Sequence, residues 1–227
     1  MTPVAELGIL EESEPRSLAE KAYEQLVRKI VRLELPPGTV IADKSLMAEL
    51  EIGRTPIREA MQRLAVEGLL HHMPNRGMFV SEISATSVQQ IYEFRSIIDG
   101  SAARLAATRA SGDDIEDLAS LHTALVHATE DDDVDQYVAL DRAFYRVLAR
   151  AATNTYLAEV IPRIFNLHLR LWFFIAQKMG TWHPIAEAHE VMTKDVAEAV
   201  RHGDPNAAER AMKVYISRRH QDIRDTM

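Results

Sequence analysis

The fold is constrained most strongly by a change of pattern near residue 84 of this 227-residue chain. From there to the C-terminus, apolar residues recur every three or four positions, as one buried helix face requires. The breaks in this period fall near residues 111–112, 131–133, 153–154, 180–184 and 203–205. No segment after residue 84 has the pattern of a strand, so residues 84–227 are predicted to form a bundle of about six helices.

Residues 16–83 have a different order of elements. A helical period runs from Ser17 to Glu34 and is expected to end at Pro36-Pro37-Gly38, because proline and glycine stop helices. The elements after it are a helix at 46–50, a tight turn at 51–53, a helix at 55–67 and hairpin strands at 69–73 and 77–80. This is the layout of a winged helix-turn-helix, whose second helix enters the major groove of DNA.

The predicted fold class is therefore mainly α: an N-terminal winged helix-turn-helix over residues 16–83 and a C-terminal all-helical bundle over residues 84–227. The boundary falls near residues 81–86, where serine and threonine offer helix N-caps. Residues 1–15 carry four glutamates and no basic side chain. We expect them to form a flexible acidic tail.

Composition excludes several classes of protein. The chain has no cysteine, which rules out disulfide scaffolds, thiolate metal sites and thiol nucleophiles. The longest apolar run, Leu171 to Ala176, is six residues long and too short to span a membrane. The N-terminus has no basic residue before Arg16 and does not resemble a secretory signal. We therefore expect a cytoplasmic protein without a membrane partner.

The formal net charge of −8 argues at first against a nucleic-acid partner, because phosphate binding needs lysine and arginine. The acidity is unevenly placed, however. The tail carries −4 and residues 84–227 carry −5, whereas residues 16–83 hold 10 basic and 9 acidic side chains, a net of +1. The predicted DNA-reading segment is thus not acidic, and we expect modest nonspecific affinity for DNA.

Basic and hydroxyl side chains gather at the start of the predicted second helix. Arg54 and Arg58 are four residues apart and share a face, and Thr55 lies where its hydroxyl can cap the helix or meet a phosphate. Two guanidinium groups so placed can contact guanine edges or backbone oxygens. Alternatively, they pair with acids on a solvated face. The acids within reach are Asp43, Glu51 and Glu59. The hairpin that follows favours DNA.

These motifs resemble those of the GntR transcription regulators. The resemblance covers residues 16–83 and rests on Ile52-Gly53-Arg54-Thr55-Pro56-Ile57-Arg58-Glu59-Ala60, Leu64, Glu67-Gly68-Leu69 and Pro74-Asn75-Arg76-Gly77. It implies that Arg54 and Arg58 contact bases or phosphates. It also places Lys44 at the DNA backbone, Thr55 at a phosphate, and the wing turn Arg76-Gly77 in the minor groove.

One position departs from the pattern of that family. Gly53 stands where GntR regulators usually have a serine or threonine hydroxyl. Either a phosphate contact is missing in this chain, or the backbone N–H supplies it.

The C-terminal bundle carries polar side chains on its apolar stripes. Arg95, Asp141, Tyr145, Thr193 and Tyr215 all fall on faces that are predicted to be buried. A buried charge is costly unless it is paired or meets a ligand, so the set suggests one internal polar pocket. Two simpler explanations stay open. Arg95 and Asp141 could form a buried ion pair, and the tyrosine hydroxyls could bond backbone carbonyls.

Residues 86–224 resemble the FCD effector domain of the FadR-type branch of GntR regulators. The resemblance rests on Tyr92-Glu93-Phe94-Arg95, Asp141-x-x-Phe144, Asn154 to Leu157, Gly203-Asp204, Ala207-Ala208, Met212 and Tyr215-Ile216. In that family an aspartate and three histidines usually hold a divalent metal, beside which a small carboxylate effector binds. The histidine positions are Tyr145, Thr193 and Tyr215 in this chain, so only the aspartate, Asp141, survives.

This departure predicts a pocket without a metal cofactor, because zinc and nickel prefer imidazole ligands. Arg95 would contact an anionic effector through its charge. The other predicted effector-binding residues are Asp141, Tyr145, Asn154, His189, Thr193 and Tyr215. A repositioned metal at Asp141 and His189 is the less favoured alternative. His189-Glu190-Val191-Met192-Thr193 only begins like a zincin helix, because Thr193 stands at the second ligand position.

The expected function is that of a homodimeric, ligand-responsive transcriptional repressor that binds a short inverted repeat in double-stranded DNA. A small carboxylate would change the spacing of the two DNA-reading domains and so their affinity for DNA. No partnered nucleophile is visible, so we expect no enzymatic activity. Two alternatives remain: a helical-bundle enzyme acting on a small acid through Asp141 and His189, and a constitutive DNA binder with a pure dimerisation domain.

Overall fold

The structure, a computed structural model, describes residues 17–227, so the predicted acidic tail lies outside the described residues. By their contacts, these residues form two compact units. The described part of the N-terminal unit comprises residues 17–87 and 166–174. The helical unit comprises residues 88–165 and 175–227.

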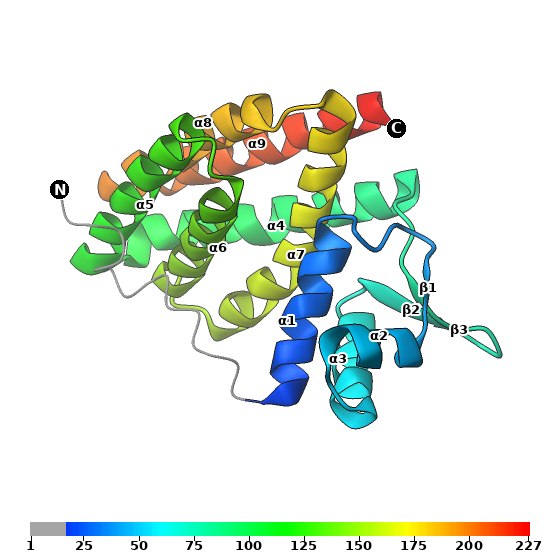
Figure 1. Cartoon of the computed structure of the whole chain (residues 1–227). Helices are drawn as coiled ribbons and strands as arrows, with labels where there is room; N and C mark the ends of the chain where they lie inside the picture. The colour runs from blue at the N-terminus through cyan, green and yellow to red at the C-terminus, as the bar shows by residue number, and fades with distance from the viewer. Residues whose placement is uncertain (1–16) are drawn as a thin grey trace. The chain divides into compact units, whose positions relative to one another are not determined.

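The structure is mainly α, as predicted (Figure 1). The helices are α1 (Leu18–Val31), α2 (Asp43–Leu50), α3 (Arg54–Val66), α4 (Ala85–Arg109), α5 (Gly112–Glu130), α6 (Val134–Ala151), α7 (Thr155–Met179), α8 (His183–Arg201) and α9 (Pro205–Thr226). The strands are β1 (Val40–Ile41), β2 (Leu70–Met73) and β3 (Gly77–Val80). The six helices from α4 onward confirm the predicted bundle. Within residues 17–227, no helix has the length and apolar character needed to cross a membrane.

Helix α1 forms because its N-terminus is capped and one of its faces is apolar. The Ser17 hydroxyl accepts a 3.1 Å hydrogen bond from the Glu20 N–H, and the apolar face is buried from Ala22 to Val31. The helix ends at Val31, three residues before the predicted end. Leu33 adopts a left-handed conformation (φ 62°), which breaks the helical path ahead of the prolines.

A three-stranded antiparallel sheet completes the winged domain, in the order β1-β3-β2. The predicted hairpin is present, with Met73 paired to Gly77. Its turn is tight because Asn75 and Gly77 both have positive φ angles, 62° and 96°. Strand β1, which pairs Val40 with Phe79, was not predicted. Two residues are too few to show the alternation that marks a strand.

A sharp turn joins α2 to α3. Glu51 ends α2 with φ 54°, and Gly53 is the N-cap residue of α3. Helix α3 begins at Arg54 and buries Ile57 and Leu64 completely. The opposite face of α3, which Arg54 opens, is therefore exposed.

The breaks between the C-terminal helices coincide with side-chain caps. Ser111 and Asp114 form a capping box at the start of α5. Asp133, Asn154 and Asp204 cap α6, α7 and α9 by accepting hydrogen bonds from first-turn N–H groups. Each cap lies at or directly beside a predicted break in the helical period.

Candidate nucleic-acid interface and effector site

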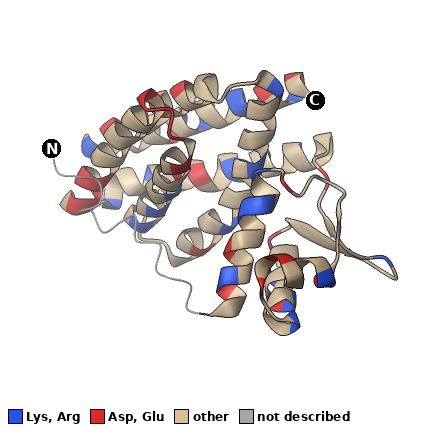
Figure 2. Ribbon diagram, viewed as in Figure 1, with Lys and Arg blue, Asp and Glu red and all other residues tan. Residues whose placement is uncertain are grey.

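The predicted DNA-contacting residues lie at the start of α2, at the start of α3 and at the hairpin turn. Lys44 is in the first turn of α2, while Arg54 and Thr55 open α3, and all three are exposed. Arg76 and Gly77, at the turn from β2 to β3, are exposed as well. Figure 2 shows basic residues at that hairpin tip and on α2 and α3. Their exposure makes these side chains accessible to DNA.

Arg58 lies on the same exposed face of α3, and 61% of its side chain is exposed. Its Nε donates a 2.8 Å hydrogen bond to Oδ2 of Asp43, the first residue of α2. Asp43 is thus the acid that pairs with Arg58, out of the three considered from the sequence. An exposed ion pair contributes only about 0–1 kcal/mol, so a phosphate or a guanine can compete for this guanidinium group.

Gly53 leaves the N-terminus of α3 without a side-chain cap. Its backbone has an ordinary φ of −66°, and it makes no side-chain hydrogen bond to the helix. Among residues 17–227, no neighbouring atom lies within 4 Å of the place that a Cβ atom would occupy. The first-turn N–H groups of α3 therefore have no side-chain acceptor, and such groups are suited to a phosphate oxygen.

The hairpin tip is shaped by aromatic contacts. The guanidinium carbon of Arg76 lies 5.7 Å from the ring centroid of Phe79, within the range of a cation–π contact. The Phe79 ring stacks on His71 at 5.6 Å between centroids. Gly77, with its φ of 96°, takes a conformation that other residues rarely adopt. The wing therefore presents Arg76 from a defined turn.

Residues 166–174 of α7 belong to the N-terminal unit, and their polar side chains form hydrogen bonds with its other elements. Asn166 Nδ2 donates to the Tyr23 hydroxyl at 3.3 Å, and that hydroxyl donates to Glu67 at 2.7 Å. Arg170 donates from Nη2 to the Ser81 carbonyl, and burial lowers the pKa of Arg170 to about 10. Sequence reasoning missed these contacts, because the partners are far apart along the chain.

In the helical unit, Arg95 is buried and paired within its own helix. Its side chain is 1% exposed, and its Nε donates a 2.7 Å hydrogen bond to Oδ2 of Asp99, one turn along α4. The suggested ion pair between Arg95 and Asp141 is therefore wrong, because the partner of Arg95 is Asp99. Burial raises the pKa of the Asp99 carboxyl, and the charge of Arg95 opposes that rise. The sequence did not single out Asp99 as the partner of Arg95, because an arginine and an aspartate four residues apart on a helix are equally typical of a salt bridge on the surface.

Asp141 lies instead against His189. Oδ1 of Asp141 and Nε2 of His189 are 3.1 Å apart, although their orientation does not make a hydrogen bond. On the other side of the imidazole, Nδ1 is 2.7 Å from the hydroxyl of Tyr137. All three residues are buried, on α6 and α8. Tyr137 was not predicted from the sequence, where it fits an ordinary core aromatic residue.

The two tyrosines at the predicted effector site surround the same imidazole. The His189 ring centroid lies 6.4 Å from that of Tyr145 and 5.4 Å from that of Tyr215. The guanidinium carbon of Arg95 lies 5.0 Å from the centre of the Tyr145 ring. Burial raises the pKa of Tyr145 and of Tyr215 above the usual value, so both hydroxyls stay protonated near neutral pH.

Thr193, the remaining position of that set, is buried and hydrogen-bonded. Its hydroxyl donates to the Glu190 carbonyl at 3.0 Å and lies 3.0 Å from Nδ1 of His122. Burial lowers the pKa of His122, which favours the neutral imidazole. His122 was another residue that sequence reasoning missed.

Asn154 serves as the N-cap of α7. Its Oδ1 accepts hydrogen bonds from the N–H groups of Tyr156 at 3.1 Å and Leu157 at 3.2 Å. The amide oxygen is thus engaged in the helix cap.

The polar residues of α4, α6, α8 and α9 form a buried cluster, in which four side-chain atoms have no hydrogen-bond partner among residues 17–227. These atoms are Arg95 Nη1, Asp99 Oδ1, Asp141 Oδ1 and His189 Nε2. Leaving such a buried atom unpaired costs about 1–3 kcal/mol, and buried polar groups are nearly always satisfied. We call Arg95, Asp99, Asp141, Tyr145, His189, Thr193 and Tyr215 the polar cluster. Two of the four atoms, Asp141 Oδ1 and His189 Nε2, face each other at 3.1 Å, which leaves Arg95 Nη1 and Asp99 Oδ1 as the unpaired donor and acceptor.

The polar cluster does not fit the metal site that the family resemblance implies. Among residues 17–227, no three histidine or carboxylate side chains are grouped closely enough to hold a metal ion. Asp141 and His189 supply two ligands of suitable chemistry, whereas phenol and alcohol hydroxyls are poor ligands for zinc and nickel. The residues present therefore do not match an aspartate and three histidines.

A winged helix-turn-helix with exposed basic side chains, joined to a helical domain with a buried polar cluster, defines a DNA-binding transcriptional regulator. Residues 18–80 match the family described as bacterial regulatory proteins, gntR family, and residues 90–218 match the FCD domain. The chain belongs to the FCD-containing branch of the GntR family.

Relatives and solved structures agree with that assignment. The chain is 33% identical to the Nta operon transcriptional regulator of Aminobacter aminovorans over 130 residues, which cover 56% of this chain and 60% of that protein. It is 26% identical to the HTH-type transcriptional repressor RspR of Escherichia coli over 206 residues, 90% of this chain and 88% of the relative. The fold is similar to that of E. coli McbR/YncC, with a TM-score of 0.71 and 21% identity over 90% of this chain and 98% of that one.

Proposed function

We propose that this DNA-binding regulator is a cytoplasmic, homodimeric repressor that binds a short inverted repeat and responds to a small anionic carboxylate. The observation that carries the ligand response is Nη1 of the buried Arg95, a charged donor that has no hydrogen-bond partner in the described part of the chain. Two relatives support the repressor role by their names: RspR of E. coli and a probable D-xylose utilization operon repressor of Paenarthrobacter nicotinovorans, 26% identical over 88% of this chain and 86% of that protein.

In the proposed DNA complex, α3 enters the major groove. Arg54 and Arg58 then reach bases or phosphates, and Arg58 exchanges Asp43 for DNA. Thr55 and Lys44 hold phosphates, which position the domain without reading sequence. Arg76 enters the neighbouring minor groove from the wing. Two such domains related by a twofold axis read two half-sites of an inverted repeat.

In the proposed effector complex, the carboxylate of the ligand accepts hydrogen bonds from Arg95 Nη1 and from the hydroxyls of Tyr145 and Tyr215. Asp99 Oδ1 is an acceptor that also needs a partner, and Asp141 Oδ1 has beside it only His189 Nε2, which is not oriented for a hydrogen bond. A simple acid cannot satisfy them, so the effector should carry hydroxyl donors as well, as hydroxy acids and sugar acids do. No metal takes part in this binding, because the residues do not match the family's ligand set.

A thermal-shift screen of hydroxy acids, sugar acids and simple carboxylic acids tests this proposal on the full chain. A true effector binds the folded state and therefore raises Tm. At a ligand concentration of a hundred times its Kd, binding adds about 2.7 kcal/mol to the free energy of unfolding. The same compound should change DNA affinity and remain unconsumed. Stabilisation without any change in DNA binding would contradict the ligand response, and consumption of the compound would favour the enzyme alternative. Metal analysis of untagged protein should find no stoichiometric transition metal.

A further inference from the structure

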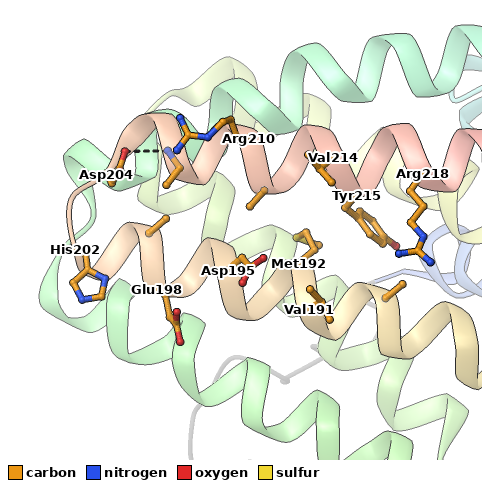
Figure 3. Close-up of a pocket in the computed structure, with 14 residues that line it drawn as sticks. Val191, Met192, Asp195, Glu198, His202, Asp204, Arg210, Val214, Tyr215 and Arg218 are labelled. Atoms are coloured by element: carbon orange, nitrogen blue, oxygen red, sulfur yellow. Dashed lines mark hydrogen bonds between the residues drawn. The ribbon is translucent and has the colours of Figure 1, made fainter.

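The α8–α9 hairpin carries an open groove on its outer side, which shares only Tyr215 with the proposed effector site (Figure 3). The groove has a volume of about 720 Å³. Its floor is made of small and apolar residues from both helices. Val191 on α8 and Val214 on α9 face across it, and they are 61% and 68% exposed. Large apolar side chains so exposed, gathered in one groove, mark an interaction surface.

The two walls of this groove carry opposite charges. Asp195 and Glu198 line it from α8, whereas Arg210 and Arg218 line it from α9. A further lining acid, Asp204, lies in the turn, where its carboxylate is engaged as the N-cap of α9. Within residues 17–227, the side chains of the four helix residues form no hydrogen bond or ion pair. The hairpin therefore presents an apolar strip between an acidic rim and a basic rim, with both rims available to a partner.

The geometry points to a second copy of this chain as the occupant of the groove, an inference that rests on the homodimer of the proposed function. A twofold interface brings the same patch together from both subunits, so the patch must complement itself. One acidic wall and one basic wall on a shared apolar floor meet that requirement. A partner of uniform charge would oppose one of the two walls.

The charges also select the direction of the twofold axis. Helices α8 and α9 run antiparallel around the turn at residues 202–204, and Figure 3 shows Arg210 at the same end of the groove as Asp195 and Glu198. An axis parallel to the helices lays α8 over the partner's α9, so the acidic wall meets Arg210 across the interface. An axis that lies in the plane of the interface but perpendicular to the helices lays α8 over the partner's α8. The acidic residues of the two subunits would then oppose each other.

Charge reversal tests this inference by sedimentation equilibrium of the full chain. Asp195→Lys/Glu198→Lys and, separately, Arg210→Glu should each raise the dimer dissociation constant by at least about tenfold, because like charges then oppose across the interface. The triple variant with all three changes restores opposite signs, and we expect its dissociation constant to return to within about threefold of the unmodified chain. The matched control is Glu116→Lys/Glu159→Lys, which reverses two exposed charges outside the groove.

The outcomes separate this inference from the proposed function. Weakened dimers in both reversed variants, with recovery in the triple variant, support the groove as the interface. A stable dimer in every variant would overturn the inference and leave the homodimer intact. Weak dimers in all three variants, without recovery, would overturn the twofold axis parallel to the helices. A monomeric unmodified chain would contradict the homodimer of the proposed function itself.

Discussion

Arg58 and Asp43 join the two helices of the DNA-reading motif through a 2.8 Å hydrogen bond from Nε to Oδ2. Arg58 lies on the exposed face of α3, and Asp43 is the first residue of α2. The acid fixes one edge of the guanidinium group, while its Nη groups make no further hydrogen bond within residues 17–227. The pair thus holds the Arg58 side chain in place in the absence of DNA. Because an exposed ion pair is weak, replacing Asp43 by DNA as the partner of Arg58 costs little free energy.

Replacing Arg58 by alanine should weaken specific DNA binding and leave the fold intact. We expect a loss of about 1–3 kcal/mol in discrimination between specific and nonspecific DNA, because a base contact disappears. The free energy of unfolding should change by no more than about 0.5 kcal/mol, since the side chain is exposed. Fluorescence anisotropy with a selected duplex and urea unfolding measure the two quantities. Unchanged discrimination would mean that Arg58 does not read bases.

Replacing Gly53 by serine should strengthen both the helix and the complex with DNA. A side chain fits at this position without contact, and its hydroxyl can cap α3 or meet a phosphate. We expect a few tenths of a kcal/mol in stability and about a threefold gain in affinity, as for one added hydrogen bond. Gly53→Ala is the matched control, because it adds the Cβ atom without the hydroxyl. Equal affinities for the serine and alanine variants would show that no phosphate lies there.

Replacing the buried pair as Arg95→Met/Asp99→Leu should abolish the effector response while preserving the fold. Removing Arg95 alone leaves a buried uncompensated carboxylate, which costs about 3–5 kcal/mol, whereas an apolar pair of similar volume is often tolerated. DNA affinity without effector should therefore stay unchanged, and the ligand-induced rise in Tm should vanish. The readouts are thermal shift and DNA binding with the compound found in the screen. A retained response would assign Arg95 a purely structural role.

Acid should weaken the start of α5 through Asp114. Burial by itself raises the pKa of Asp114, but hydrogen bonds from the Ser111 N–H and hydroxyl and from Arg150 together lower it. A carboxyl whose pKa is lowered in the folded state stabilises the protein above its unfolded pKa of about 3.9. That stability is lost as pH falls through the lower folded pKa.

Asp114→Asn should consequently cost about 1 kcal/mol at pH 7 and flatten the loss of stability below about pH 4. Urea unfolding of both proteins between pH 3 and pH 7 checks the slope. Parallel pH profiles for the two proteins would contradict this role of Asp114.

Local signals in the sequence were enough for the helices and for the exposed DNA-reading face. Arg54, Thr55 and Arg58 occupy one short helix, whose apolar period determines which face is buried. The two-residue strand β1 and the early end of α1 at Val31, ahead of the left-handed Leu33, carry no such signal. They depend on pairing with β3 and on a single backbone angle.

The interior of the effector domain was predictable only in part. A helical period shows that Arg95 and His189 point inward, but not which side chain meets them across the core. Asp99 replaced Asp141 as the partner of Arg95, and Tyr137 and His122 entered from positions that look like ordinary helix residues. Such partners are fixed by the packing of whole helices, which no single segment encodes.

In vitro selection from a pool of random duplexes with the full chain tests whether α3 reads DNA through its exposed arginines. We predict that the unmodified protein enriches a short inverted repeat. Under the same conditions, the variant Arg54→Ala/Arg58→Ala, which should remain folded, is predicted to enrich no motif. Enrichment of the same repeat by both proteins would contradict the reading of DNA by these arginines.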